Sequence, residues 1–575
     1  MPSSTGDGGP LAPVRTRARP ARFFATDARR LACTLLLVGA LVAFGCGERG
    51  EERGDAGAGE QPGYGGTVVV LGPNDLDYAN SLVNAEGYTA ELLRFALFLP
   101  LIRYDAELNF EPYLAEGYEL LGDTGVVFRL RQNVYWHDSV KTSAHDVLFT
   151  YERAKDPATA FPNADYFAKW GAAEIIDSFT IRFRFEPHAD ALAGWAFTPI
   201  MPRHLLKAFA SKDLRNAPFN KNPVGNGPFK FVSYQANDRW VFEANPSFPQ
   251  ELGGRPYLDR LVWRVVPENP AQLTEVLSGN ADLMISTRAD QVKQHDPAAD
   301  LRGIIKPSRK YDFIAWNGKR PPFDNPRVRK ALTLAIDRKE ILDALRGGFG
   351  ELAAGPIAPF HWAFDASLRP LPYDTAAARA ILTELGFRDR NGDGILEDER
   401  GKRFVFSITI PAGVDFSRDV AEMVRADLEA VGVRMTTRQL EANTLIGDIF
   451  SPERRFDATI LRWEADFRIG LYDLFHSAAL NDPYQFASYS NPEVDRIIDQ
   501  APLISDRERA FPMWKRLQEI MRDEQPWTFM FYLPELYLMR ERVRGADMDI
   551  RGTFVNVQRW WVQSAQPVTA GGAAD

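Results

Sequence analysis

Both cysteines of this 575-residue chain, Cys33 and Cys46, lie within its first 46 residues. If the chain is cut just before Cys46, the remaining 530 residues hold one thiol and form no internal disulfide. Thiolate zinc clusters, iron–sulfur clusters and a buried cysteine nucleophile are excluded for the same reason. The body must therefore be stabilised by apolar burial and hydrogen bonds, for which a hydrophobic fraction of 45% is ordinary.

The N-terminus has the pattern of an export signal. Residues 1–30 contain six arginines, residues 31–44 are apolar, and Gly45 precedes Cys46. A basic region, an apolar stretch and a small residue before the cut are typical of a secretory signal. We expect residues 1–45 to be removed, which lowers the net charge from −9 to about −13. The Gly- and Glu-rich residues 46–65 are then expected to form a flexible tether.

The cysteine at the expected cut indicates lipidation. Residues 42–46 resemble the lipobox of bacterial lipoproteins, whose cysteine receives a diacylglycerol through sulfur, although the usual leucine three residues earlier is missing. An uncleaved membrane anchor is the alternative. The 17 residues between Arg30 and Glu48 are fewer than the ~20 that normally span a bilayer, so we favour lipidation at Cys46.

Composition and missing motifs exclude several function classes. The 68 Lys+Arg against 77 Asp+Glu give no positive field for nucleic acid. There is no Gly-x-Ser-x-Gly elbow, and neither Gly-Lys pair precedes Ser or Thr, so no P-loop exists. The seven histidines are scattered. Residues 224–228 lack the third glycine of a dinucleotide fingerprint, and a turn with positive φ explains their glycines.

One loop matches half of a calcium-binding pattern. Asp389, Asn391 and Asp393, followed by Gly394, occupy the first ligand positions, but Arg400 stands where a bidentate Glu belongs. Asn-Gly and Asp-Gly are also strong turn-forming dipeptides. We favour a tight turn, and calcium remains the alternative.

Apolar patterning predicts strands alternating with helices. Residues 67–71 are typical of a buried strand, and residues 143–155 predict a helix with Ser143 and Asp146 at its start. Further strands are expected at residues 126–130, 179–185, 404–410, 433–437, 456–463, 528–532 and 537–539. Further helices are expected at residues 91–100, 374–385 and 417–431, and others are expected to begin at Pro326, Asp337 and Pro492. One more helix is expected after Asp506, with a bend at Pro512. This alternation indicates α/β layers.

Several motifs together resemble the bacterial extracellular solute-binding proteins of family 5, the peptide- and nickel-binding components of ABC importers. The resemblance covers about residues 65–551. The motifs that carry it are residues 100–105, 112–116, 128–138, 144–147, 223–229, 325–332 and 335–338. Each is modest evidence, whereas their common order and spacing are specific. Ser139 stands where the family usually has glycine, and Asn226 where it usually has threonine.

The resemblance implies an α/β, two-lobed periplasmic-binding-protein fold, type II-like, with the extra subdomain of peptide-binding proteins and a hinge between the lobes. Lobe I is expected at residues 66–312, including the extra subdomain at about 106–217. Lobe II is expected at residues 313–533, and residues 534–575 return to lobe I and form the C-terminal tail. The lobes of this family close on the ligand like a trap.

The same resemblance implies a lipid-anchored substrate-binding protein that captures short peptides and delivers them to an ABC permease and its ATPase. We expect an exported monomer on the periplasmic or cell-surface face of a bacterial membrane, without cofactor, metal, nucleic acid or enzymatic activity. Two alternatives stay open. The scaffold could bind a nickel chelate, heme or an oligosaccharide or act as a sensor, or the chain could be a secreted hydrolase.

Four candidate ligand-binding residues follow from the resemblance. In peptide-binding relatives an aspartate just after a strand takes the ligand's α-ammonium, and the matching residue is Asp466; its alternative role is to cap a turn. Trp463 is expected as a pocket wall or as a core residue. Glu86 lies in a segment resembling the one that pairs with extended peptide backbone. Tyr532 belongs to a late aromatic strand expected to face the cleft.

Substitution of Cys46 by Ser tests the lipid anchor. Without the sulfur there is no acceptor for diacylglycerol, so the variant should leave the membrane fraction or accumulate as an uncleaved precursor. Cell fractionation and the mass of the purified protein measure both outcomes, with Cys33→Ser as the matched control. A fully processed Cys46→Ser protein that stays on membranes contradicts the prediction.

Overall fold

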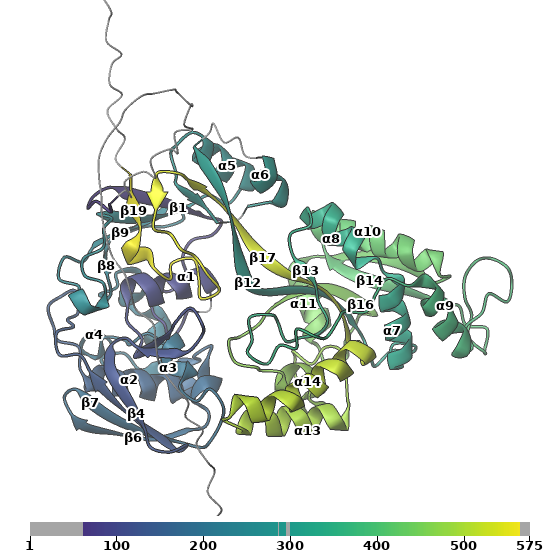
Figure 1. The fold of residues 1–575 in the computed structure, drawn as a ribbon, viewed down its shortest axis with the longest axis horizontal. Coiled ribbons are helices and arrows are strands. Elements are labelled where there is room, and N and C mark those ends of the chain that lie inside the picture. Colours follow the sequence, from purple (N-terminus) through teal and green to yellow (C-terminus); the bar gives the residue numbers. More distant parts are fainter. Residues whose placement is uncertain (1–60, 85, 286, 295–299, 564–575) are drawn as a thin grey trace, which may run out of the picture. The chain divides into compact units, whose positions relative to one another are not determined.

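Two long antiparallel strands, β12 (Leu301–Trp316) and β17 (Trp527–Arg540), connect the two lobes of the fold (Figure 1). Their pairing is continuous up to the facing residues Pro307 and Pro534 and resumes at Tyr311. Proline has no backbone N–H to donate, so two facing prolines interrupt the ladder. The interruption separates the lobe I part of each strand from its lobe II part.

The computed structural model describes residues 61–84, 86–285, 287–294 and 300–563. One mixed sheet passes through both lobes in the order β15-β14-β16-β12-β17-β11-β1-β10-β9-β8. Its other strands are β1 (Thr67–Gly72), β8 (Phe229–Gln235), β9 (Arg239–Ala244), β10 (Arg260–Val265), β11 (Leu283–Met284), β14 (Val405–Pro411), β15 (Arg434–Leu440) and β16 (Ala458–Glu464), and β13 (Glu351–Leu352) pairs with β17. Parallel pairs such as β1–β10 and β14–β15 fit the expected α/β layers.

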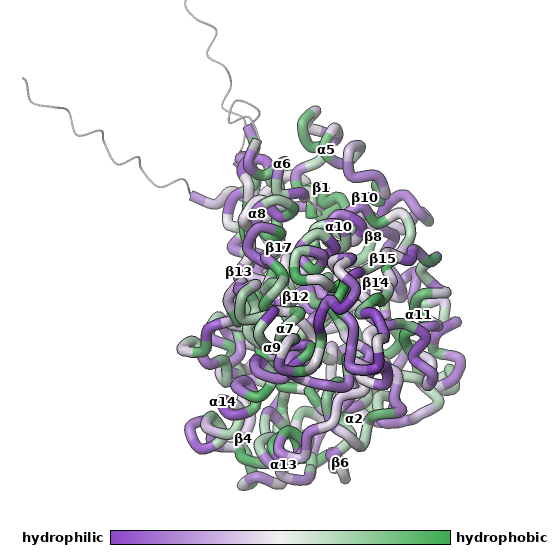
Figure 2. Tube along the Cα trace, turned by 90° about the vertical axis from the view of Figure 1, so that its right-hand side faces the viewer, coloured by the Kyte–Doolittle hydropathy of each residue, from purple (hydrophilic) through white to green (hydrophobic). Residues whose placement is uncertain are grey.

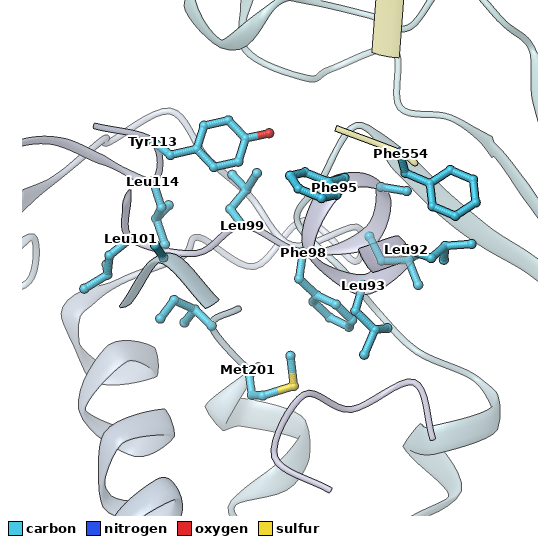
Figure 3. Packing of buried hydrophobic residues seen from close by; sticks show 14 of the residues in the cluster. Leu92, Leu93, Phe95, Phe98, Leu99, Leu101, Tyr113, Leu114, Met201 and Phe554 are labelled. Carbon is cyan, nitrogen blue, oxygen red and sulfur yellow. The ribbon is translucent and has the colours of Figure 1, made fainter. Parts of the chain in front are cut away.

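Lobe I has one large apolar core, to which the C-terminal segment returns. Figure 3 shows Phe554 of this segment beside Leu92 and Phe95. A separate four-stranded sheet, ordered β4-β5-β7-β6, packs against the same core. Further elements of lobe I include β2 (Ile102–Tyr104), β3 (Phe110–Pro112), β4 (Ala115–Leu120), β5 (Gly125–Leu130), β6 (Trp170–Asp177), β7 (Thr180–Phe185), β18 (Val543–Arg544), β19 (Trp561–Val562), α1 (Gly87–Leu92), α2 (Ala144–Lys155), α3 (Ala193–Phe197), α4 (Arg203–Leu206), α5 (Asn269–Leu277), α6 (Ala289–Gln294) and the 3₁₀ helix η3 (Ala164–Phe167).

Lobe II covers both faces of its part of the sheet with helices. One core includes residues of α7 (Pro326–Ala335), α8 (Arg338–Arg346), α9 (Thr375–Glu384) and α10 (Asp415–Ala430). The other includes residues of α11 (Ala442–Phe450), α12 (Tyr472–Phe475), α13 (Pro492–Gln500) and α14 (Arg507–Glu524). In Figure 2 hydrophobic segments follow the central strands between these helices. Burial of both faces explains why the strands read as apolar runs.

Most helix boundaries that the sequence predicts are confirmed. Ser143 and Asp146 form a capping box at α2. Asp337 accepts the N–H of Glu340 at the start of α8, and Gly347 ends that helix with a φ of +60°. Such caps satisfy backbone groups that have no partner within the helix. Local side-chain chemistry therefore places these helices correctly.

The two connecting strands differ from expectation. Residues 528–532 and 537–539 were expected as separate strands, but they belong to the single strand β17. Pro534 lies between them opposite Pro307, at the place where the ladder is interrupted, and β17 continues through it in extended conformation. β12 was not among the expected strands. Its polar residues Arg302, Lys306 and Lys310 hide the apolar alternation that would indicate a strand.

The glycines of the loop at residues 224–228 have a different purpose from the expected one. A Cβ at Gly225 would lie 2.0 Å from the carbonyl oxygen of Leu97, and one at Gly227 would lie 2.6 Å from that of Ala96. Neither glycine has a positive φ. The expected positive-φ turn is therefore wrong, and close backbone packing is the reason for these glycines.

His137 and Ser139 belong to the hairpin beside this loop. Gly225 donates its N–H to His137 Nδ1 at 3.2 Å, and burial lowers the pKa of His137 to about 4. This histidine is therefore a packing residue between the hairpin and the loop. Ser139 has a φ of +73°. Glycine adopts a positive φ without strain, which explains why the family usually has glycine at this position.

The folded body begins slightly before the expected Gly66. The ring of Tyr64 lies 5.1 Å from that of Tyr257, and Gly65 donates its N–H to the carbonyl of Tyr257 at 2.8 Å. The expected tether therefore ends before Tyr64. The expected signal and Cys46 lie outside the described residues. No helix among the described residues is both long and apolar enough to span a membrane.

Glu535 is the charged centre of the strand connection. Its carboxylate lies 2.8 Å from Lys306 Nζ and 2.6 Å from Lys310 Nζ, and the Lys306 side chain is only 3% exposed. Burial acts to raise the pKa of Glu535, but the two lysines outweigh it and lower that pKa to about 2. The carboxylate of Glu535 on β17 thus forms ion pairs with two lysines of β12.

Substitution of Glu535 by Gln should lower the free energy of unfolding by about 3 kcal/mol at pH 7, because it leaves a buried lysine without its anion. The pKa of this group is about 2 in the folded protein and about 4.3 in the unfolded chain, so its stabilisation is present above about pH 4.3 and lost as the pH falls through about 2. Urea denaturation should show a smaller difference from wild type at pH 3.

Glu541→Gln is the matched control for this experiment. Glu541 is 37% exposed and contacts Arg302 and Arg544 at the surface, so its loss should change the free energy of unfolding by less than about 1 kcal/mol. Equal effects of the two substitutions contradict a buried role for Glu535.

Candidate functional site

The predicted aspartate, Asp466, lies two residues beyond the end of β16. In the β12–β16 ladder Arg462 is opposite Asp312, and Glu464 is opposite Lys310. Because strand side chains alternate, these four residues share one face, and Trp463 between them faces the other way. Ala465 continues the pairing by donating its N–H to the carbonyl of Arg309 at 2.8 Å. The end of β16 therefore presents a row of charged side chains on one face.

Asp466 is bonded to side chains from both lobes. Tyr166, on η3 of lobe I, donates its hydroxyl to Oδ1 of Asp466 at 2.5 Å. Arg468 Nη2 lies 3.2 Å from Oδ2 of Asp466 and also contacts Asp165 of η3. The guanidinium of Arg468 stacks over the ring of Tyr166 at 3.6 Å. Burial, and next the carboxylate of Asp466, raise the pKa of Tyr166 well above its usual value.

Aromatic rings surround this charged contact. Phe467 stacks on Tyr104 and Phe197 of lobe I, with ring centroids 5.3 and 5.2 Å apart. The guanidinium of Arg94 lies over the ring of Phe197, and that of Arg309 over the ring of Phe467. These rings exclude water from one side of Asp466, which strengthens electrostatic interactions there.

A small cavity of about 120 Å³ lies beside these rings, bordered by His361, Trp362, Asp190 and Arg507. Burial lowers the pKa of His361 to about 4, so this histidine is neutral at pH 7. Arg507 of lobe II lies 3.3 Å from Asp190 of lobe I. Burial nevertheless raises the pKa of Asp190 above its usual value. A second charged pair thus joins the lobes near Asp466.

A larger cavity of about 830 Å³ opens between the lobes on the charged face of β12 and β16. Lobe I lines it with the residues that follow β11, including Thr287 and Arg288. Lobe II lines it with Arg346, Phe416 and Arg462. Its size lies within the range of small-molecule and peptide sites, and most of its polar groups are charged.

The other three predicted site residues make contacts within their own lobes. Glu86 caps α1, because its carboxylate accepts the N–H groups of Tyr88 and Thr89 at 3.0 and 2.6 Å. Trp463 packs against Tyr484 and the core of lobe II. Tyr532 is 8% exposed and donates its hydroxyl to the carbonyl of Gly355 at 2.8 Å. Tyr88, two residues after Glu86, does line the larger cavity.

Sequence reasoning missed several residues that the fold brings to the cleft. Tyr166 and Asp165 are about 300 positions from Asp466, and no local pattern links them to it. Arg468 is only two residues from Asp466, so its closeness in the sequence could have indicated that it contacts this carboxylate. Lys310 and Arg346 lie in segments whose charges resemble ordinary solvated surface.

The calcium-like loop forms the favoured turn. Gly392 and Gly394 have φ values of +78° and +83°, and both donate their N–H groups to the carboxylate of Asp389. Asp389, Asp393 and Glu397 come close enough together to share a cation. However, Arg403 contacts Asp393 at 2.6 Å. Backbone turns and an arginine therefore already use these carboxylates.

Comparisons with known proteins agree with this architecture. The family model "Bacterial extracellular solute-binding proteins, family 5 Middle" matches residues 109–479. The oligopeptide-binding protein AppA of Bacillus subtilis is 28% identical over 536 residues, covering 92% of this chain and 98% of AppA. Heme-binding protein A of Haemophilus influenzae is 28% identical over 468 residues, covering 76% of this chain and 81% of that protein.

Solved structures give the same result. The structure of Bacillus subtilis AppA in complex with a nonapeptide matches with a TM-score of 0.74 and 27% identity, covering 88% of this chain and 100% of that structure. The expected two-lobed α/β binding-protein fold is confirmed. Since the family model also matches more than half of the sequence, the chain belongs to the bacterial extracellular solute-binding proteins of family 5.

Proposed function

We propose that the protein is a lipid-anchored substrate-binding protein of an ABC importer, which captures short peptides between its lobes and delivers them to the permease and its ATPase. The anchor is the lipid on Cys46, and the protein acts as an exported monomer without a catalytic step. The lobes move about Pro307 and Pro534, where the connecting strands lose their pairing.

Asp466 is the observation that carries this proposal. Its carboxylate is 32% exposed, lies where residues of both lobes converge, and is oriented by Tyr166. A carboxylate in such a place binds a cation of the ligand and simultaneously links that cation to the second lobe. A peptide ammonium supplies this cation. Asp466 and Asp165 share the single guanidinium of Arg468, so their cluster retains a negative charge that an ammonium neutralises.

The relatives support a peptide over other solutes. AppA, which covers nearly the whole chain, is an oligopeptide-binding protein. The 830 Å³ cavity is lined by ten charged side chains. Such a lining suits a zwitterionic chain better than a large apolar solute such as heme, because charged groups lose much hydration energy when they face an apolar surface.

Replacement of Asp466 by Asn tests the ammonium site. Asn keeps the shape and an acceptor for the hydroxyl of Tyr166 but loses the charge. Removing one partner of a buried charge pair costs ~2–5 kcal/mol, so peptide affinity should fall by ~30-fold or more in calorimetric titrations. N-acetylated peptides should bind wild type poorly and show little further loss in the variant.

Asp499→Asn, at an exposed position of α13, is the matched control and should leave peptide affinity unchanged. Thermal unfolding of Asp466→Asn without peptide should stay close to that of wild type, since Asp466 is partly solvated. Unchanged peptide affinity in Asp466→Asn, or loss of the fold, counts against the assignment.

Peptide binding should compact the protein in small-angle X-ray scattering and raise its melting temperature, because the ligand stabilises the folded, closed form.

Tyr166→Phe removes the hydroxyl that joins lobe I to Asp466. We expect about tenfold weaker peptide binding, mainly through faster dissociation in stopped-flow experiments. Tyr151→Phe, which removes a hydroxyl bond within lobe I, is the control and should not affect dissociation. Identical kinetics in both variants rule out Tyr166 as a closing contact.

A further inference from the structure

The loop between α9 and β14, at the outer edge of lobe II (Figure 1), contains the dipeptide Asn391-Gly392. Asparagine followed by glycine reacts with its own backbone, because glycine has no side chain to shield its nitrogen from the amide carbon of the asparagine. The chain contains two further pairs of this kind, Asn226-Gly227 and Asn317-Gly318. The surroundings of the three pairs differ, and this difference decides which of them reacts.

The pairs at Asn226 and Asn317 are buried and closely packed. Asn226 is 1% and Asn317 0% exposed. The nitrogens of the two following glycines already donate to backbone carbonyls, both at 2.8 Å. A Cβ on Gly227 would lie 2.6 Å, and one on Gly318 2.8 Å, from a carbonyl oxygen. Such packing leaves no room for water or for the movement that ring closure needs.

The pair at Asn391 is open to solvent. Both of its residues are exposed, and a Cβ on Gly392 would meet no atom within 4 Å other than its immediate neighbours. Gly392 donates its N–H to Oδ1 of Asp389 at 2.7 Å, so the attacking nitrogen faces a carboxylate. Asp393 donates its N–H to Oδ1 of Asn391 at 2.8 Å, which polarises the amide carbonyl. A base and a hydrogen-bond donor thus contact the two reacting groups.

We propose that Asn391 deamidates spontaneously, whereas the two buried Asn-Gly pairs do not. The backbone nitrogen of Gly392 bonds to Cγ of Asn391, and its proton passes to the carboxylate of Asp389. The bond from Cγ to Nδ2 breaks, and Nδ2 leaves as ammonia with that proton. Water then opens the cyclic imide at one of its carbonyls and leaves aspartate or isoaspartate at position 391. Water is the co-reactant, and nothing is oxidised or reduced.

The reaction changes the charges inside the loop. Nδ2 of Asn391 donates to Oε1 of Glu397 at 2.8 Å, and Glu397 is only 4% exposed. After the reaction a second carboxylate replaces this donor. Two carboxylates at such a distance repel, so one of them takes up a proton or moves away. Because Glu397 forms β-bridges with Arg388 and Arg403, we expect the loop to open at this place.

Peptide mapping by mass spectrometry tests the site. The purified protein is stored at mildly alkaline pH in water labelled with heavy oxygen, which enters the product of each deamidation. Conversion should be at least about tenfold faster at Asn391 than at Asn226 and Asn317, because only Asn391 brings its reacting groups together in open solvent. Asn443, which is also exposed but precedes the β-branched Thr444, is the matched control and should react as slowly as the buried pairs.

Substitution of Asp389 by Asn tests the base. The amide keeps an acceptor for the N–H of Gly392 but does not take up a proton, so the conversion of Asn391 should slow by about tenfold or more. Asp398→Asn is the matched control and should leave the rate unchanged, since Asp398 accepts the N–H groups of Arg400 and Lys402 in the same loop.

Asn391→Asp reproduces the aspartate product and tests its effect on the loop. Trypsin should cut this variant after Arg390 or Arg400 about fivefold faster than it cuts wild type, because the repelling carboxylates raise the population of the open loop. Asn443→Asp adds the same charge at an exposed position of α11 and should be cut like wild type.

Three outcomes overturn the proposal. Conversion at Asn391 that is no faster than at Asn443, or that is slower than at a buried pair, refutes the site. An unchanged or faster conversion in Asp389→Asn refutes the role of this carboxylate as the base. Unchanged trypsin cleavage of Asn391→Asp refutes the effect on the loop.

Discussion

The pairing of β12 with β17 is the constraint on which the rest of the structure depends. These strands belong to both lobes, and their pairing changes register between Pro307 and Tyr311, beside Pro534, and again between Asp312 and Phe313. Glu535 holds two lysines of β12 beside this interruption. The backbone is thus free to bend where no N–H is available, while a buried carboxylate keeps the strands together. The proposed closure of the lobes on a ligand needs both properties.

The cleft follows from the same strands. β16 pairs with β12, and two charged residues on one face of this ladder, Lys310 and Arg462, line the cavity between the lobes. At one end of the face Asp466 meets Tyr166 and Asp165 of lobe I through direct and arginine-mediated contacts. Farther along the same face, Arg462 lies opposite Asp312 and Lys310 opposite Glu464, so cations and carboxylates alternate there.

Residues far apart in the sequence account for most of what sequence reasoning missed. The position of Asp466 after a strand was visible from its neighbours, because a strand and its following turn are local features. For Tyr532 and Glu86, the neighbouring residues did not distinguish a structural role from a role in ligand binding. Tyr532 fastens a segment near Gly355 by a hydroxyl bond, and Glu86 caps a helix. Both contacts depend on geometry that residue type alone does not reveal.

The sequence by itself determined the α/β class, most helices with their caps, and the membership of the family, because these depend on local propensity and on motif order. It missed β12 and divided β17, since charged residues and a proline disguise strands that are stabilised by long-range pairing. Only the tertiary structure decided which charges meet in the cleft. Tyr166 and Asp466 are 300 residues apart, and Asp312 contacts Arg346 and Arg462 from separate elements. The physical reason is that burial and partnership set the energy of a charge, and the fold alone assigns both.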